Sequence, residues 1–143
     1  MSLFGSMQVS ASGMAAQRTR AEMLVENLAN SETTRTPEGG PYKRKDVVFS
    51  SEEQTSPFSA VFQNEVGNGV TVSDISVDDS APEMRYMPNH PDADANGYVA
   101  FPKLNPAEDM ADLLSATRSY EANVAAISSV KDMISRSIDI LRS

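Results

Sequence analysis

The fold of this chain is decided mainly by its C-terminal stretch, residues 105–143, which reads NPAEDMADLLSATRSYEANVAAISSVKDMISRSIDILRS. It opens with Asn105 and Pro106, followed by Glu108 and Asp109. An N-cap amide, a first-turn proline and acidic side chains all suit the N-terminus of a helix. No proline follows Pro106. The stretch therefore predicts one helix of about 37 residues, roughly 55 Å long, a length typical of a coiled coil.

Apolar residues recur in this stretch at alternating spacings of three and four, which predicts a heptad seam. The seam comprises Met110, Leu113, Thr117, Tyr120, Val124, Ile127, Lys131, Ile134, Ile138 and Leu141. The N-terminal part of the chain repeats the period with Phe4, Met7, Ala11, Met14, Arg18, Ala21, Val25 and Leu28. We therefore predict that the two ends of the chain pair as a coiled coil.

Each predicted helix also carries a second apolar stripe. It comprises Ala126, Val130, Met133 and Ile140 in the C-terminal helix, and Val9, Ala16 and Met23 in the N-terminal one. A helix pair needs one seam per helix, so we expect Val130 and Met133 to be exposed in an isolated pair and covered by neighbouring subunits. The alternative is a wide stripe in an ordinary three- or four-helix bundle, for which this chain offers only two long helices.

The middle of the chain is rich in turn residues: all eight prolines lie between Pro37 and Pro106. Residues 70–77 alternate β-branched and polar side chains, with a slip in parity between Val72 and Ile75 that predicts a β-bulge. Residues 98–101 and 59–63 are further strand candidates, and residues 32–58 and 80–97 are predicted to be extended loops. The predicted fold is mainly α with a β-containing insertion, divided into an N-terminal helix (1–36), a central β/loop segment (37–104) and a C-terminal helix (105–143).

Composition excludes several classes of function. The 143 residues carry 12 Lys and Arg against 20 Asp and Glu, a net charge of −8, which disfavours nucleic-acid binding. No apolar run approaches the roughly 20 residues of a membrane span, and residues 1–8 do not look like a cleaved signal peptide. Without cysteine and with a single histidine, His90, the chain offers no thiolate or histidine metal cluster and no serine triad. We expect no catalytic residue, no cofactor and no metal.

Residues 92–97, DADANG, match the first half of a calcium-binding loop. The second half fails, because Lys103 stands where a bidentate glutamate is needed. Asp and Asn are equally common in turns, where they bond their own backbone. We therefore expect Asp92, Asp94 and Asn96 to form a structural turn.

Other charged clusters favour exposed surface over chemistry. Adjacent acids such as Glu108 and Asp109 point apart on a helix, so solvated surface is expected. The basic triplet Lys43-Arg44-Lys45 is interpreted as an exposed, solubilising cluster, with contact to an acidic partner as the alternative. His90 lies in a proline-flanked turn and is expected to be exposed or packed.

Asn27 and Asn30 stand three residues apart near the end of the N-terminal apolar period, so their amides share one face. One interpretation is a helix C-cap. The other is a polar lock between helices, like the buried asparagines that set register in coiled coils.

These residues also belong to a recognisable pattern. The run Glu26-Asn-Leu28-Ala-Asn30-x-x-Thr33 resembles the signature that closes the N-terminal helix of the bacterial flagellar rod and hook axial proteins. Ser119-Tyr120-Glu-Ala-Asn123-Val124 resembles the partner motif of that family, and residues 70–102 and the compact length are similar to its proximal rod subunits. Ser31-Glu32 and Lys103 depart from the family pattern.

The resemblance implies a structural subunit of the basal-body proximal rod, polymerised through its terminal helices into a tubular shaft that transmits torque and encloses an export channel. The implied partners are further copies, other proximal and distal rod proteins, the rod-base adaptor, the membrane ring and the type III export apparatus, with export to the periplasm-spanning rod without a cleaved signal. The alternative is a non-polymerising coiled-coil adaptor with a β-rich insertion. The predicted packing residues are Asn27, Leu28, Asn30, Thr33, Tyr120, Asn123, Val124, Ile127, Val130, Met133, Ile134 and Ile138.

Overall fold

The computed structural model describes residues 3–52 and 68–142. In these described residues, two long helices enclose four strands in chain order. The elements are α1 (Leu3–Ala29), β1 (Lys45–Glu52), β2 (Gly69–Val77), β3 (Glu83–Tyr86), β4 (Tyr98–Phe101) and α3 (Pro106–Arg142). The predicted fold class, mainly α with a β-containing middle, is confirmed.

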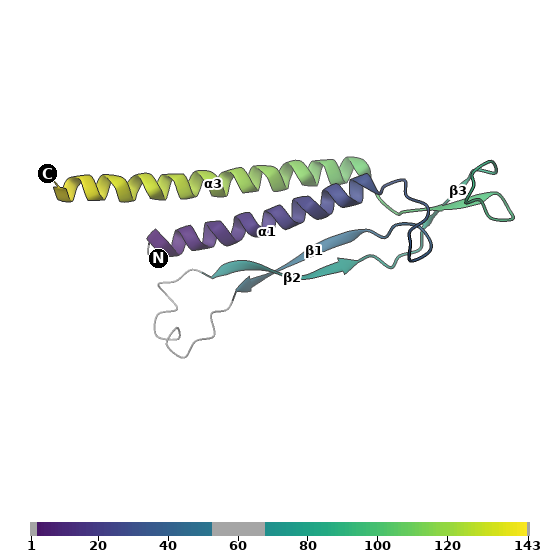
Figure 1. Ribbon diagram of the computed structural model, residues 1–143, viewed down its shortest axis with the longest axis horizontal. Helices are drawn as coiled ribbons and strands as arrows, with labels where there is room; N and C mark the ends of the chain where they lie inside the picture. Colours follow the sequence, from purple (N-terminus) through teal and green to yellow (C-terminus); the bar gives the residue numbers. More distant parts are fainter. Residues whose placement is uncertain (1–2, 53–67, 143) are drawn as a thin grey trace.

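The molecule is elongated, and its middle part has three layers (Figure 1). Helix α1 lies in the middle, antiparallel to α3 on one side and against the β1–β2 hairpin on the other. The β3–β4 hairpin projects beyond the end of the helix pair where α1 ends and α3 begins. At the opposite end, α3 extends past the N-terminus of α1 as a single helix.

Helix α3 runs for 37 residues without a break, as predicted. Its N-cap is Asn105, whose Oδ1 accepts a 3.2 Å hydrogen bond from the amide of Ala107. Helix α1 runs for 27 residues and ends at Ala29. No helix in the described part of the chain is both long enough and apolar enough to cross a membrane.

The predicted bulge is present in the β1–β2 hairpin. Val48 pairs with Asp74 and Phe49 pairs with Val72, so Ser73 has no partner residue across the ladder. The Ser73 hydroxyl instead donates a 3.1 Å hydrogen bond to the carbonyl of Val48. Strand β1 itself is a correction, because Lys45–Glu52 falls in a stretch predicted to be a loop.

The β3–β4 hairpin confirms the strand predicted at residues 98–101 and corrects the loop prediction for residues 83–86. Gly97 precedes β4 at a φ of 80°, and a Cβ there would lie 2.9 Å from the ring of Tyr86. Both the backbone conformation and the space therefore require glycine. The strand candidate at residues 59–63 lies outside the described residues.

Candidate assembly surface

The seam between α1 and α3 is made of small and polar residues. On α3 the innermost positions recur every seven residues, at Asp109, Ala116, Asn123 and Val130. Ala116 is fully buried, and Ala16 of α1 is nearly so. A Cβ on Gly13 would lie only 3.2 Å from Nδ2 of Asn123, so the two helices approach closely here.

This seam corrects the predicted assignment of stripes. Val130, expected to be exposed in an isolated pair, is 8% exposed and belongs to the innermost row. Met133 is 47% exposed, as expected. Sequence periodicity establishes the spacing of apolar residues, but the choice of contact row depends on which side chains are small enough to let the helices approach.

The predicted heptad seam of α3 instead flanks the true contact. Leu113, Ile127 and Ile134 are half-buried beside it. The remaining large apolar members point to solvent, and with Leu114 they form what we call the outer stripe: Met110, Leu114, Tyr120, Val124, Ile138 and Leu141. Five of the six are more than 40% exposed and Tyr120 is 40% exposed.

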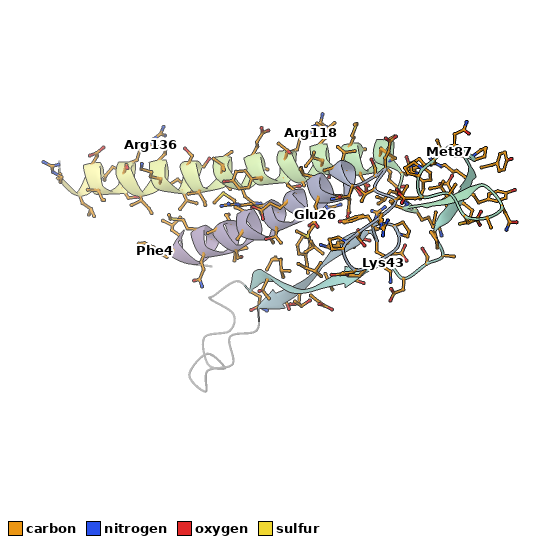
Figure 2. All side chains as sticks on the ribbon, turned by 45° about the vertical axis from the view of Figure 1, so that its right-hand side comes forward. Phe4, Glu26, Lys43, Met87, Arg118 and Arg136 are labelled. Carbon is orange, nitrogen blue, oxygen red and sulfur yellow. The ribbon has the colours of Figure 1, made fainter. Side chains whose placement is uncertain are left out.

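A second exposed surface of α3 lies next to the outer stripe, on the side of the helix that faces away from α1. Figure 2 shows Arg118 and Arg136 on the side of α3 that faces away from α1, and Phe4 at the free end of α1. A shallow depression of about 480 Å³ lies on this face, lined by Ala111, Leu114, Ser115, Arg118, Ser119 and Ala122. Small side chains that leave such a depression suit the approach of another helix.

Asn27 is a polar lock, but it does not lock two helices together. Its side chain is fully buried and pairs with the backbone of Lys45 as a strand would: Nδ2 donates to the Lys45 carbonyl at 2.9 Å, and Oδ1 accepts from the Lys45 amide at 3.0 Å. The Tyr42 hydroxyl also donates to Oδ1, at 2.9 Å. Asn27 therefore attaches the end of α1 to the start of β1.

Asn30 is the C-cap that the other interpretation predicted. Its amide Nδ2 donates to the carbonyl of Glu26 at 2.9 Å, and its Oδ1 accepts from the Thr33 hydroxyl at 3.1 Å. Leu28, between the two asparagines, is half-buried. The motif thus combines a cap with a tertiary anchor.

The basic triplet is neither a free solubilising cluster nor left for an outside partner, because each member pairs with an acid of this chain. Lys43 Nζ lies 2.5 Å from Asp79 Oδ1, and Lys45 Nζ lies 2.6 Å from Glu26 Oε1. Arg44 reaches both Asp46, at 3.1 Å, and Asp109, at 3.3 Å. The triplet therefore connects α1, the hairpins and α3.

Two residues at this junction were missed from the sequence. Asp109 was expected on a solvated face and is only 1% exposed. Tyr42, which no pattern singled out, is 8% exposed, and burial, together with the charges of Glu26 and Asp109, raises the pKa of its hydroxyl to about 12. The sequence does not indicate that either side chain is buried, because each is covered by segments that are distant in the chain.

The 92–97 segment is a turn that uses its own oxygens. Asp94 Oδ1 accepts from the amides of Asn96 and Tyr98, both at 2.8 Å. Asp92 Oδ2 accepts from the Thr34 hydroxyl at 2.8 Å, and His90 Nδ1 accepts from the Asp92 amide at 3.1 Å. In the described part of the chain, no three His, Cys, Asp or Glu side chains gather as metal ligands would.

The sequence of this chain is similar to those of known flagellar proteins. Residues 95–140 match the family model described as flagellar basal body rod FlgEFG protein C-terminal. The chain is 39% identical to the flagellar basal-body rod protein FlgC of Borreliella burgdorferi, over 99% of each chain. It is 43% identical to FlgC of Bacillus subtilis, over 98% of this chain and 99% of that one. This chain belongs to the FlgC family. It is also 35% identical to FlgC of Salmonella typhimurium, over 98% of both chains.

Proposed function

We propose that this chain is a structural subunit of the flagellar basal-body proximal rod. It polymerises through its terminal helices into the tubular drive shaft that transmits torque and encloses the export channel. Membership of the FlgC family supports a place in the basal-body rod and a structural rather than catalytic role. It also favours the rod subunit over the alternative of a non-polymerising adaptor.

The observation that carries polymerisation is the outer stripe of α3. Its large apolar side chains lie along the helix and are between 40% and 86% exposed. Extended apolar surface of this kind marks an interaction site on a soluble protein. A contact between unlike faces of successive subunits need not close, and open repetition of such a contact gives a helical filament.

The free end of α3 supports the same proposal. Ile138, Ile140 and Leu141 are 51%, 75% and 86% exposed where α3 extends past α1. Phe4, at the start of α1, is 76% exposed. Since most helical stability in proteins comes from packing, these turns gain stability when neighbouring subunits cover them.

The partners follow from this role. They are further copies of the chain, other proximal and distal rod proteins, and the rod-base adaptor with its membrane ring. The chain reaches the periplasm-spanning rod through the flagellar type III export apparatus without a cleaved signal. Helix ends of marginal stability suit passage through a narrow channel. The predicted packing residues that are exposed or half-buried on α3, such as Tyr120 and Met133, contact neighbouring subunits.

Charge substitutions in the outer stripe test the proposal. Val124→Asp and Ile138→Asp remove little packing from the single chain, so purified variants should unfold within about 1 kcal/mol of the unchanged protein. In cells that lack the unmodified copy, both variants should abolish rod formation and swimming, because an unpaired charge buried in every intersubunit contact is costly. Normal rods in both strains would refute assembly through this stripe.

Ser129→Asp is the matched control. Ser129 is exposed and lies five residues beyond Val124, so it points to a different side of α3. This variant adds the same charge to the same helix and should leave more rods than Val124→Asp.

Sedimentation at rising protein concentration distinguishes a rod subunit from a non-polymerising adaptor. A rod subunit self-associates progressively or stays monomeric, whereas an adaptor forms one closed oligomer.

A further inference from the structure

A buried carboxylate lies at the junction of the helix pair with the β-region. Asp109, in the first turns of α3, faces Arg44, which immediately precedes β1. The Asp109 side chain is 1% exposed, and neither oxygen accepts a hydrogen bond from the described residues. Among the described residues, its one close cationic neighbour is the Arg44 guanidinium, whose Nη2 lies 3.3 Å from Oδ1.

Other charges around Asp109 are mostly negative. Arg44 is shared with Asp46, which takes two of its contacts at 3.1 and 3.2 Å. Arg20 of α1 is engaged by Asp112 at 3.3 Å. The ionisable groups that act on Asp109 from the adjoining elements are Arg44, Asp46 and Tyr42 on the β1 side and Glu108 and Asp112 on α3, with Glu26 of α1 paired to Lys45 next to them.

Ionisation of Asp109 is therefore costly in the closed junction. A buried carboxylate is stabilised by hydrogen bonds and by opposite charge, and Asp109 has only a shared arginine and the dipole of the first turn of α3. Burial outweighs the attraction of Arg44 and raises the pKa of Asp109, and the carboxylates of Asp46, Asp112 and Glu108 add to this.

We propose that Asp109 makes this junction a pH-sensitive hinge: the contact between α3 and the segment before β1 is most stable with Asp109 protonated and opens more readily once Asp109 is ionised. Opening brings the carboxylate into water, where its charge is solvated. The Asn27 contacts to Lys45 involve no ionisable group, so α1 and β1 stay attached while the first turns of α3 separate from Arg44. This property concerns the single chain and does not depend on the rod role.

The direction follows from proton linkage. In the open junction Asp109 titrates near its ordinary value of about 3.9, and in the closed junction it titrates higher. Between these two values the closed form holds more protons than the open form. Raising the pH through that window therefore favours opening, by at most about tenfold per pH unit. Above the window the opening equilibrium is constant.

Hydrogen exchange of the full chain between pH 4 and 7, corrected for the intrinsic exchange rate, tests this hinge. The informative amides are those of residues 110–113 in α3 and that of Asp78, which donates to the Arg44 carbonyl at 2.8 Å. We expect their protection to fall with rising pH and then to level off. The Lys45 amide, which donates to Asn27, should keep its protection throughout.

Three variants make the test specific. Asp109→Asn removes the charge and should give protection that does not change with pH. Glu108→Gln, at the exposed neighbouring position, removes only the smallest of the repulsions from neighbouring carboxylates, so the fall in protection should remain and move only slightly to lower pH. Arg44→Gln removes the one cation beside Asp109 and should extend the fall in protection to higher pH.

The proposal is overturned if the unmodified chain shows no pH dependence at these amides, or if Asp109→Asn keeps it. Should that variant fail to fold, the carboxyl carbon of Asp109 in the unmodified chain can be titrated by NMR. A midpoint above the ordinary range supports the hinge, and a midpoint at or below about 3.9 overturns it.

Discussion

The hydroxyl of Tyr42 donates a 2.9 Å hydrogen bond to the side-chain oxygen of Asn27, and the same oxygen accepts the backbone amide of Lys45. This arrangement joins the last turn of α1 to the chain that enters β1. The Asn27 side-chain amide also hydrogen-bonds both backbone groups of Lys45. It therefore takes the place that the backbone of a neighbouring strand would occupy. The family motif at the end of α1 thus has a structural role inside each subunit, in addition to any role between subunits.

Replacement of Asn27 should be among the most destabilising changes in α1. Asn27→Ala leaves the Tyr42 hydroxyl and both backbone groups of Lys45 without partners, and each buried unsatisfied group costs about 1–3 kcal/mol. We expect a loss of about 3 kcal/mol or more in urea unfolding. Asn30→Ala removes a local cap and should cost only about 1 kcal/mol. Equal losses for both variants would contradict the anchor role of Asn27.

Tyr42 predicts a loss of stability in strong alkali. Its pKa is about 12 in the folded chain, above the ordinary tyrosine value of about 10. The folded state therefore holds this proton more tightly, so the stabilisation is complete below pH 10 and falls as the pH rises toward 12. A shift of this size corresponds to about 2–3 kcal/mol. Unfolding free energies measured from pH 9 to 12 should show this component in the unmodified chain, and Tyr42→Phe should remove it.

The close approach of Gly13 and Asn123 predicts a size limit in the helix seam. Gly13→Leu should destabilise the chain by about 1–3 kcal/mol, because the added side chain meets the Asn123 amide. Asn123→Ala creates space, so the double variant should be more stable than the two separate losses imply. A double-mutant cycle in urea measures this coupling, and simple additivity would show that the two residues do not share the site.

The same substitution should destabilise the chain far more at Val130 than at Val124. Val130→Asp places a charge in the closed seam and should destabilise the purified chain by about 3 kcal/mol or more. Val124→Asp, on the 45% exposed side chain, should leave the chain nearly as stable as before. Circular dichroism during thermal unfolding distinguishes them. A stable Val130→Asp chain would contradict the packing of this row.

Asp94 should stabilise its turn without calcium. Asp94→Ala removes two hydrogen bonds to backbone amides and should destabilise the β3–β4 hairpin by about 1–2 kcal/mol. Calorimetry should detect no saturable calcium binding at millimolar concentrations in either protein. Saturable binding that is lost in Asp94→Ala would instead establish a calcium site.

Local chemistry was sufficient to predict the two long helices, β2 and β4, but not β1 or β3, which were predicted to be loops. The placement of proline predicts two long helices around a turn-rich middle, because proline interrupts the hydrogen bonds of a helix interior. The slip in parity between Val72 and Ile75 predicts the bulge that the structure shows at Ser73. The aspartates of residues 92–97 likewise predict a turn, because their side chains bond amides only a few residues away.

The rotation of the helices and the buried polar junction were decided by tertiary structure alone. Periodicity places Val124 and Val130 on two stripes of α3 but does not choose which one contacts α1. The choice depends on Gly13, Ala16 and Ala116, whose small size lets the helices approach on the Val130 side. Asp109 lies buried beside Arg44, which comes from a distant part of the sequence. A single polar contact such as Asp109 with Arg44 leaves no periodic trace in either segment, so only the folded chain reveals it.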